Sequence, residues 1–204
     1  MRYRLLGAAL GLAAVTLAAP SHVGLTRAAT TGLTPAAAAA APQLVQSTGA
    51  SETSAATALT ASFPAPTLGG SLLVLSASIY TGTTNQIRSV TDSAGNTWTK
   101  IGAFASAGHY SDGEMWYAPG TQSVTAVTVH TASAAVVAMS MQEFTGVATT
   151  NALDVSAGSS DTGTSAASGA VTPTADNELA VGFVAIRGPA LATLRQPSTR
   201  HRVR

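Results

Sequence analysis

Residues 89–101 read SVTDSAGNTWTKI, and this stretch decides the fold class. Strand-forming residues flank its centre, which has the composition of a turn. The Asp92 carboxylate can accept backbone N–H bonds within the loop, and Gly95 can supply a positive φ before Asn96. We therefore predict that Asp92, Gly95 and Asn96 form a structural turn, as a four- or five-residue hairpin connection that ends before Trp98.

A calcium loop is the alternative interpretation of this stretch. It would use the side-chain oxygens of Asp92, Ser93 and Asn96. Calcium prefers about six to eight oxygen ligands, usually from several carboxylates, and this segment holds one carboxylate. The composition therefore favours a turn.

The rest of the chain repeats this alternation of strand and turn. Short strand-like runs are separated by residues rich in Gly, Pro, Asn and Ser, with turn signals about every 8–12 residues. Residues 134–144 have some helix propensity, but their valines and the flanking Gly146 favour a strand. The pattern predicts an all-β fold, an antiparallel β-sandwich that is jelly-roll-like, over residues 43–186. The predicted strands are Gln43–Ser47, Ala58–Phe63, Leu72–Tyr80, Gln86–Val90, Thr97–Ala105, His109–Ala118, Ser123–His130, Ala135–Phe144, Leu153–Ala157, Gly169–Thr172 and Leu179–Ile186.

The N-terminus has the layout of a secretory signal peptide. Two arginines precede an apolar core at Leu5–Ala19, and small residues follow. We predict a signal peptide at residues 1–27, forming a signal helix, and an Ala/Pro-rich linker at 28–42. The apolar run is shorter than the roughly 20 residues that a membrane-spanning helix needs, which disfavours the alternative of an uncleaved anchor. The expected protein is secreted or at the cell surface, with no membrane span after signal cleavage.

The composition excludes several classes of function. Charged residues make up 9% of the 204 residues, against about 25% in average proteins, and the formal net charge is +1. There is no Cys, which excludes a disulfide framework and a thiolate metal site. No basic face interleaved with aromatic residues indicates nucleic acid, and no phosphate-binding or dinucleotide-binding motif indicates a cofactor.

Five segments in succession resemble a β-sandwich module of large secreted and surface-attached bacterial proteins. Such modules occur alone or beside fibronectin-type or immunoglobulin-like repeats and sugar-active domains. The resemblance covers about residues 43–186, and it implies a fold and an extracellular location but no catalytic residues. The segments are SVTDSAGNTWTKI, EMWYAPG, QSVTAVTV, MQEFTGVATTNALDVSAG and DNELAVGFVA.

The C-terminal end departs from that module. The module usually continues after Ile186 into one or two further strands, whereas residues 187–204 form a basic tail, predicted to be disordered, with five of the ten Lys and Arg residues. The tail is either an anchor for anionic wall polymers or lipid head groups, or a truncated or frame-shifted end. The abrupt change of composition favours the second reading. A missing strand would leave an unpaired edge through which the protein could self-associate.

One predicted strand carries the candidate ligand-binding residues. Alternation places Tyr110, Asp112, Glu114 and Trp116 on one face. Because acids avoid protein cores, we expect this face to be exposed, with its aromatic rings available to stack on sugars. The alternative is that these aromatic residues pack at an edge or against another domain.

The same acids raise the question of glycoside hydrolysis. A glycosidase needs two carboxyl groups that face one cleft, about 5 to 9.5 Å apart. Glu114 has Asp112 beside it, and Glu143 ends another strand, but the strand lacks the third acid of a Glu-x-Asp-x-Glu pattern. We favour a solvent-facing acidic stripe that pairs with Arg88 or Lys100.

Two histidines form the candidate metal site. If Pro119 and Gly120 close a hairpin over residues 109–130, His109 lies opposite His130 on the same face. Two imidazoles at that separation could hold zinc or copper, but no neighbouring residue supplies a third ligand. The alternative is a pair of half-exposed polar strand residues.

The sequence as a whole favours a non-catalytic extracellular module for surface display, adhesion or glycan binding. Its expected partner is an extracellular glycan or cell-wall polymer, and we expect no cofactor. One alternative is an accessory domain or remnant of a secreted polysaccharide-degrading enzyme. Another is a structural spacer.

Overall fold

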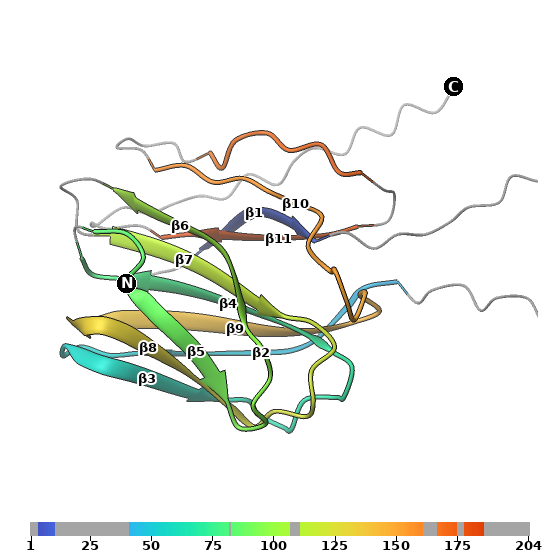
Figure 1. Ribbon diagram of the computed structural model, residues 1–204, viewed down its shortest axis with the longest axis horizontal. Coiled ribbons are helices and arrows are strands. Elements are labelled where there is room, and N and C mark those ends of the chain that lie inside the picture. Colours follow the sequence, from blue (N-terminus) through green and yellow to red (C-terminus); the bar gives the residue numbers. More distant parts are fainter. Residues whose placement is uncertain are drawn as a thin grey trace, which may run out of the picture.

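The computed structural model describes residues 4–10, 41–81, 83–106, 111–160, 167–174 and 178–185. These residues form eleven strands and no helix (Figure 1). In chain order the strands are β1 (Arg4–Leu10), β2 (Gln43–Ser51), β3 (Ala56–Ser62), β4 (Leu72–Ile79), β5 (Ile87–Asp92), β6 (Thr99–Ser106), β7 (Ser111–Ala118), β8 (Ala126–Ala135), β9 (Val137–Thr145), β10 (Val155–Ser156) and β11 (Leu179–Val184).

The strands are arranged in three layers. A five-stranded central sheet has the order β2-β9-β4-β7-β6. The sheet β3-β8-β5 lies on one side of it, and the small sheet β10-β1-β11 lies on the other (Figure 1). Every pairing is antiparallel. The predicted all-β, antiparallel fold is therefore confirmed, and its layers are consistent with a β-sandwich.

Strand β4 lies at the centre of the fold, and all eight of its residues are buried. Its odd-numbered residues, such as Leu73 and Leu75, pack into the core beneath β3-β8-β5. Leu72 and Val74 point to the opposite face, where they pack with Val181 of β11. Both faces of the central sheet are covered, which explains why every residue of this strand is buried, including Ser76 and Ser78.

Most of the predicted strands correspond to observed ones. Residues 134–144 fall largely in β9, so the choice of strand over helix is confirmed. The exception is Gly169–Thr172, where the structure has no strand. This segment lacks the alternation of core and surface residues that fixes a strand in a sheet, and Gly169, Val171 and Thr172 are exposed.

Part of the predicted signal helix is a strand instead. Residues Arg4–Leu10 form β1, which pairs with β11 through Ala8↔Val181 and with β10 through Ala9↔Val155. An extended segment there pairs with both β10 and β11 and satisfies backbone groups of each, which a helix could not do. The other residues of 1–27, the linker up to residue 40 and the basic tail lie outside the described residues. Within those that are described, no helix has the length and apolar character to cross a membrane.

Candidate functional site

The face of β7 that was predicted to bind ligand is buried. Asp112, Glu114 and Trp116 share one face, as alternation predicted, but their exposed fractions are 0%, 0% and 8%. The expectation of an exposed platform is therefore wrong. Since a layer covers each side of the central sheet, neither face of β7 is open. Tyr110 lies outside the described residues.

Glu114 is buried because donors surround its carboxylate. Its Oε1 accepts the backbone N–H of Ile87 at 2.7 Å, and its Oε2 lies 2.7 Å from Lys100 Nζ and 3.2 Å from Trp116 Nε1. The ammonium group of Lys100 also lies 4.8 Å from the centre of the Trp116 ring. Acids are rarely fully buried unless they are paired in this way. Of the two predicted partners, Lys100 pairs with Glu114, and Arg88 is exposed elsewhere.

The carboxylate of Asp112 has fewer hydrogen-bond donors than that of Glu114. Its Oδ2 accepts the backbone N–H of Gln86 at 3.1 Å, while Oδ1 has no hydrogen-bond partner among the described residues. Burial raises the pKa of Asp112 to about 7; the N–H of Gln86 opposes this rise and the negative charge of Glu114 adds to it. The carboxyl group of Asp112 is therefore only partly ionised at neutral pH.

The Asp112–Glu114 pair tethers the start of β5 to the central sheet. Both acids bind backbone N–H groups of adjacent residues, Gln86 and Ile87, across the gap between the sheets. A glycosidase needs its two carboxyls in a cleft that admits a sugar and a water molecule. These two are sealed, so their arrangement suits holding a loop and does not suit acid–base chemistry on a substrate.

Glu143 of β9 has the same kind of role at another loop. Its side chain is fully buried and accepts hydrogen bonds from the N–H of Leu68 at 2.7 Å, the hydroxyl of Ser71 at 2.8 Å and the amide of Gln46 at 2.7 Å. It fixes the loop that leads into β4. Glu143 lies opposite Leu73 of β4 and Glu114 lies opposite Ala77, so the two acids are separated along the sheet, and each has its own donors.

The opening stretch contains a turn held by Asp92. The Asp92 carboxylate accepts the N–H groups of Ala94 and Asn96 at 2.8 and 3.2 Å and the indole N–H of Trp98 at 2.7 Å. Partial burial raises the pKa of Asp92, but these hydrogen bonds outweigh it, and the net pKa lies below the usual value. Gly95 has φ of +74°. The oxygens that a calcium ion would need are occupied by N–H donors.

The predicted hairpin at this turn is nevertheless wrong. Among the described strands, β5 pairs only with β8, and β6 pairs only with β7. The turn is therefore an arch that carries the chain from the outer sheet to the central one. The carbonyl oxygen of the Asn96 side chain accepts the N–H of Gln122 at 2.7 Å, which ties the arch to a neighbouring loop rather than to a hairpin partner.

The predicted histidine pair depends on a second hairpin that does not form. Strands β7 and β8 belong to different sheets, because β8 pairs with β3 and β5. His130 therefore lies between Ala58 and Ser89, with its Nε2 3.0 Å from the hydroxyl of Thr91. His109 lies outside the described residues. Among the residues that are described, no three His, Cys, Asp or Glu side chains gather as a metal site would require.

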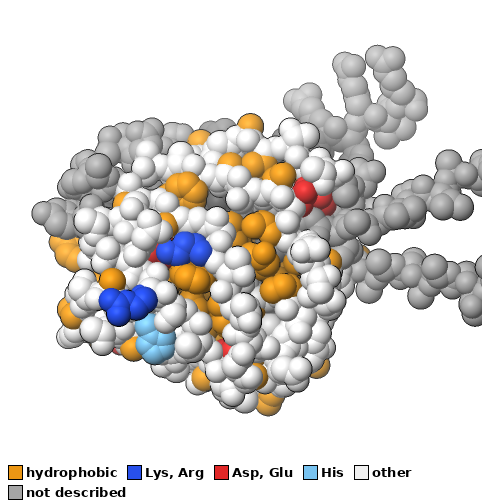
Figure 2. All heavy atoms as spheres, in the orientation of Figure 1, with side chains coloured by type: hydrophobic (Ala, Val, Ile, Leu, Met, Phe, Trp, Pro, Cys, Tyr) orange, Lys and Arg blue, Asp and Glu red, His pale blue; other side chains and the backbone are white. Residues whose placement is uncertain are grey.

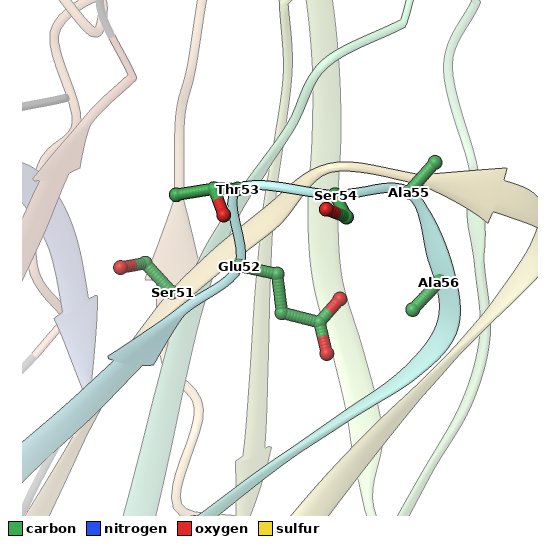
Figure 3. Close-up of a pocket in the computed structure, with 6 residues that line it drawn as sticks. All are labelled: Ser51, Glu52, Thr53, Ser54, Ala55 and Ala56. Carbon is green, nitrogen blue, oxygen red and sulfur yellow. The ribbon is translucent and has the colours of Figure 1, made fainter.

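A hollow of about 380 Å³ lies at the corner between β2 and β3. Six consecutive residues, 51–56, line it, and Figure 3 shows the Glu52 carboxylate turned into the space that they enclose. The Oε2 atom of Glu52 is buried without a hydrogen-bond partner among the described residues. One carboxylate among Ser, Thr and Ala side chains offers neither a catalytic pair nor a ligand set.

The outer face of β3-β8-β5 is a feature that the sequence analysis missed. Thr60, Thr128 and Thr91 lie side by side across the three strands, and the hydroxyls of Thr60 and Thr128 are 2.8 Å apart. The two residues that flank Thr128 in β8, Val127 and Val129, point into the core. The alternation of Val with Thr and His in β8 was a signal for this face, but the strand order that aligns the three threonines is not visible in the sequence.

Comparisons of this chain with protein-family models, with curated proteins and with solved structures gave no match.

Proposed function

We propose that this chain is a non-catalytic extracellular β-sandwich module that serves in surface display, adhesion or glycan binding. One observation carries the proposal: the carboxylates that could have done chemistry are used to hold loops. Asp92 holds the β5–β6 arch, Asp112 and Glu114 hold the start of β5, and Glu143 holds the loop before β4. Asp154, which is half-exposed, accepts hydrogen bonds from the N–H and hydroxyl of Thr174 in the same manner.

The strand order supports a jelly-roll architecture for the module. In the central sheet β2 pairs with β9, β9 with β4, and β4 with β7, while β3, β8 and β5 form the opposing sheet. This is the order of an eight-stranded jelly roll in which one strand, β6, has moved beside β7 instead of β5. Jelly rolls are common among lectin domains, which is consistent with a binding role.

The proposed extracellular location is supported by the sequence. The N-terminal segment has a basic start and an apolar core, as secretory signal peptides do. The chain has few charges and no Cys, so its surface relies on Ser, Thr and Asn for solubility.

The accessory domain or remnant of a polysaccharide-degrading enzyme has less support. Its acids would need access to substrate, and Asp112, Glu114 and Glu143 each have an exposed fraction of 0%. The structural spacer remains the interpretation to adopt if no ligand is found.

The experiment measures binding and hydrolysis together. The purified chain is applied to a glycan array and incubated with insoluble polysaccharides, and newly formed reducing ends are counted. We expect binding to at least one glycan class and no new reducing ends. Hydrolysis that disappears in folded Glu114→Gln or Glu143→Gln variants would overturn the proposal, and silence in both assays would establish the spacer.

A further inference from the structure

The outer face of β3-β8-β5 is an uncharged, hydroxyl-lined surface. Its exposed or half-exposed residues are mainly short: Thr60 and Ser62 from β3, Thr128 from β8, and Ser89 and Thr91 from β5. Neighbouring strands lie about 4.7–4.9 Å apart, so hydroxyls of one row recur at about that spacing. Such a row can donate and accept hydrogen bonds along an extended chain of sugar rings.

Two basic residues lie at one end of this face. His130 is opposite Ser89, and Arg88 is the neighbour of Ser89 at an irregularity in the β5 register. Arg88 is exposed and has no ion pair among the described residues, unlike Lys100, which is bound to Glu114. Figure 2 shows a basic side chain next to the histidine ring, on a surface where charged groups are few.

No acid offsets these two groups on the face. Among the described acids, Asp112, Glu114 and Glu143 are buried in the core, and Asp92 is bound within its turn. The others lie on other segments: Glu52 at the β2–β3 corner, and Asp154 and Glu178 beside β10 and β11. Among the described residues this face is therefore locally positive.

We propose that this face binds an acidic polysaccharide, meaning a polymer of sugar rings that carry carboxylate groups. Arg88 binds a carboxylate through its planar guanidinium, His130 contacts the same or the next acidic group, and the threonine row binds the ring hydroxyls. A polymer with a charge at every unit and no rings, such as polyphosphate, fits less well, because two basic groups occupy one end and uncharged hydroxyls occupy the rest. This inference rests on the proposed glycan-binding function and names its surface and its ligand class.

The test uses the full chain and three probes: polygalacturonate, neutral dextran and polyphosphate. Binding is measured by affinity electrophoresis and by calorimetry at low and high ionic strength. We expect polygalacturonate to bind most tightly, and more weakly at high salt, because exposed charges are screened beyond about 10 Å at 0.1 M salt. Arg88→Gln should weaken binding about tenfold, which is the loss of one charge-assisted hydrogen bond.

The hydroxyl row is tested by Thr128→Val and controlled by Thr99→Val. Valine keeps the β-branched shape in each strand, and Thr99 is an exposed threonine on β6 of the central sheet. We expect Thr128→Val to bind polygalacturonate more weakly than the parent, and Thr99→Val to bind it as tightly as the parent.

The possible failures are distinct. Tight binding of polygalacturonate that Arg88→Gln and Thr128→Val leave unchanged would overturn this face while the proposed function stands. Binding of dextran alone would overturn the acidic ligand, and preference for polyphosphate would overturn the sugar-ring component. Absence of any binding here and on the glycan array would overturn both proposals.

Discussion

At the scale of single residues, Glu143 carries the clearest energetic prediction. Glu143→Ala would leave the N–H of Leu68 and the hydroxyl of Ser71 without their buried acceptor. Each unsatisfied buried group costs about 1–3 kcal/mol, so we expect a loss of about 3 kcal/mol in the free energy of unfolding. Urea unfolding measures it, and exposed Gln43→Ala is the control. Equal stability of Glu143→Ala and the parent would show that the loop holds without this anchor.

Asp112 predicts an unusual dependence of stability on pH. Its pKa is raised from the ordinary value of 3.8 to about 7 in the folded protein, so the folded state binds the proton more tightly than the unfolded state. This group therefore contributes stability that is fully present below pH 3.8 and is lost as the pH rises through about 7. We expect Asp112→Asn to flatten the decline of the melting temperature between about pH 4 and 8, because asparagine does not titrate. A variant with the same decline as the parent would assign it to other groups.

The burial of these acids could not be predicted from the sequence. Asp112 and Glu114 alternate with Gly113 and Met115, a pattern that indicates an outward polar face. Their donors lie far along the chain: Ile87 is 27 residues from Glu114, and Leu68 is 75 residues from Glu143. Alternation identified correctly which residues share a face, but the packing of β3-β8-β5 on the central sheet decides that this face is buried.

At the scale of elements, the β5–β6 arch is held by a hydrogen bond from Trp98 to Asp92. Trp98→Phe removes the indole N–H that binds Asp92 at 2.7 Å and leaves the aromatic packing largely intact. Hydrogen bonds to charged groups are worth about 1.5–3 kcal/mol, and partial exposure reduces this value. We therefore expect Trp98→Phe to lower the free energy of unfolding by roughly 1–2 kcal/mol at neutral pH, as measured by urea unfolding.

The same measurement at low pH is the control for the Trp98→Phe prediction. The lowered pKa of Asp92 contributes stability above its unfolded value, and this contribution is lost as the pH falls through the folded value. The difference in unfolding free energy between Trp98→Phe and the parent should therefore shrink in acid. A difference that stays constant with pH would mean that packing, rather than the bond to Asp92, is lost.

The arch also shows why the topology was harder to predict than the turn. Asp92, Gly95 and Asn96 specify a tight reversal through contacts within five residues, and these are visible in the sequence. A hairpin and an arch between sheets use the same turn residues. The choice depends on β8 pairing with β3 and β5, which is decided by burial across the whole sandwich. The same reason explains the failure of the predicted His109 and His130 pairing.

At the scale of the whole molecule, the small sheet β10-β1-β11 is the part that export would change. Strand β1 lies within the predicted signal peptide and pairs with β11 from Leu10↔Leu179 to Arg4↔Val184. Cleavage after residue 27 would remove it and leave that side of β11 with unpaired backbone groups. The strands of the two larger sheets, β2-β9-β4-β7-β6 and β3-β8-β5, pair without β1, and these sheets should persist.

A chain that lacks residues 1–27 is therefore expected to fold and to self-associate through β11, because an unpaired edge is a template for another strand. Light scattering should show dimers or larger species that grow with concentration, while the full chain remains monomeric. Ala180→Lys places a charge at an exposed position of that edge and should restore the monomer in the shortened chain. If the shortened chain stays monomeric at all concentrations, another segment covers β11 after cleavage. If it associates equally with and without Ala180→Lys, the contact lies elsewhere, and the free edges of β2 and β6 become the next surfaces to block.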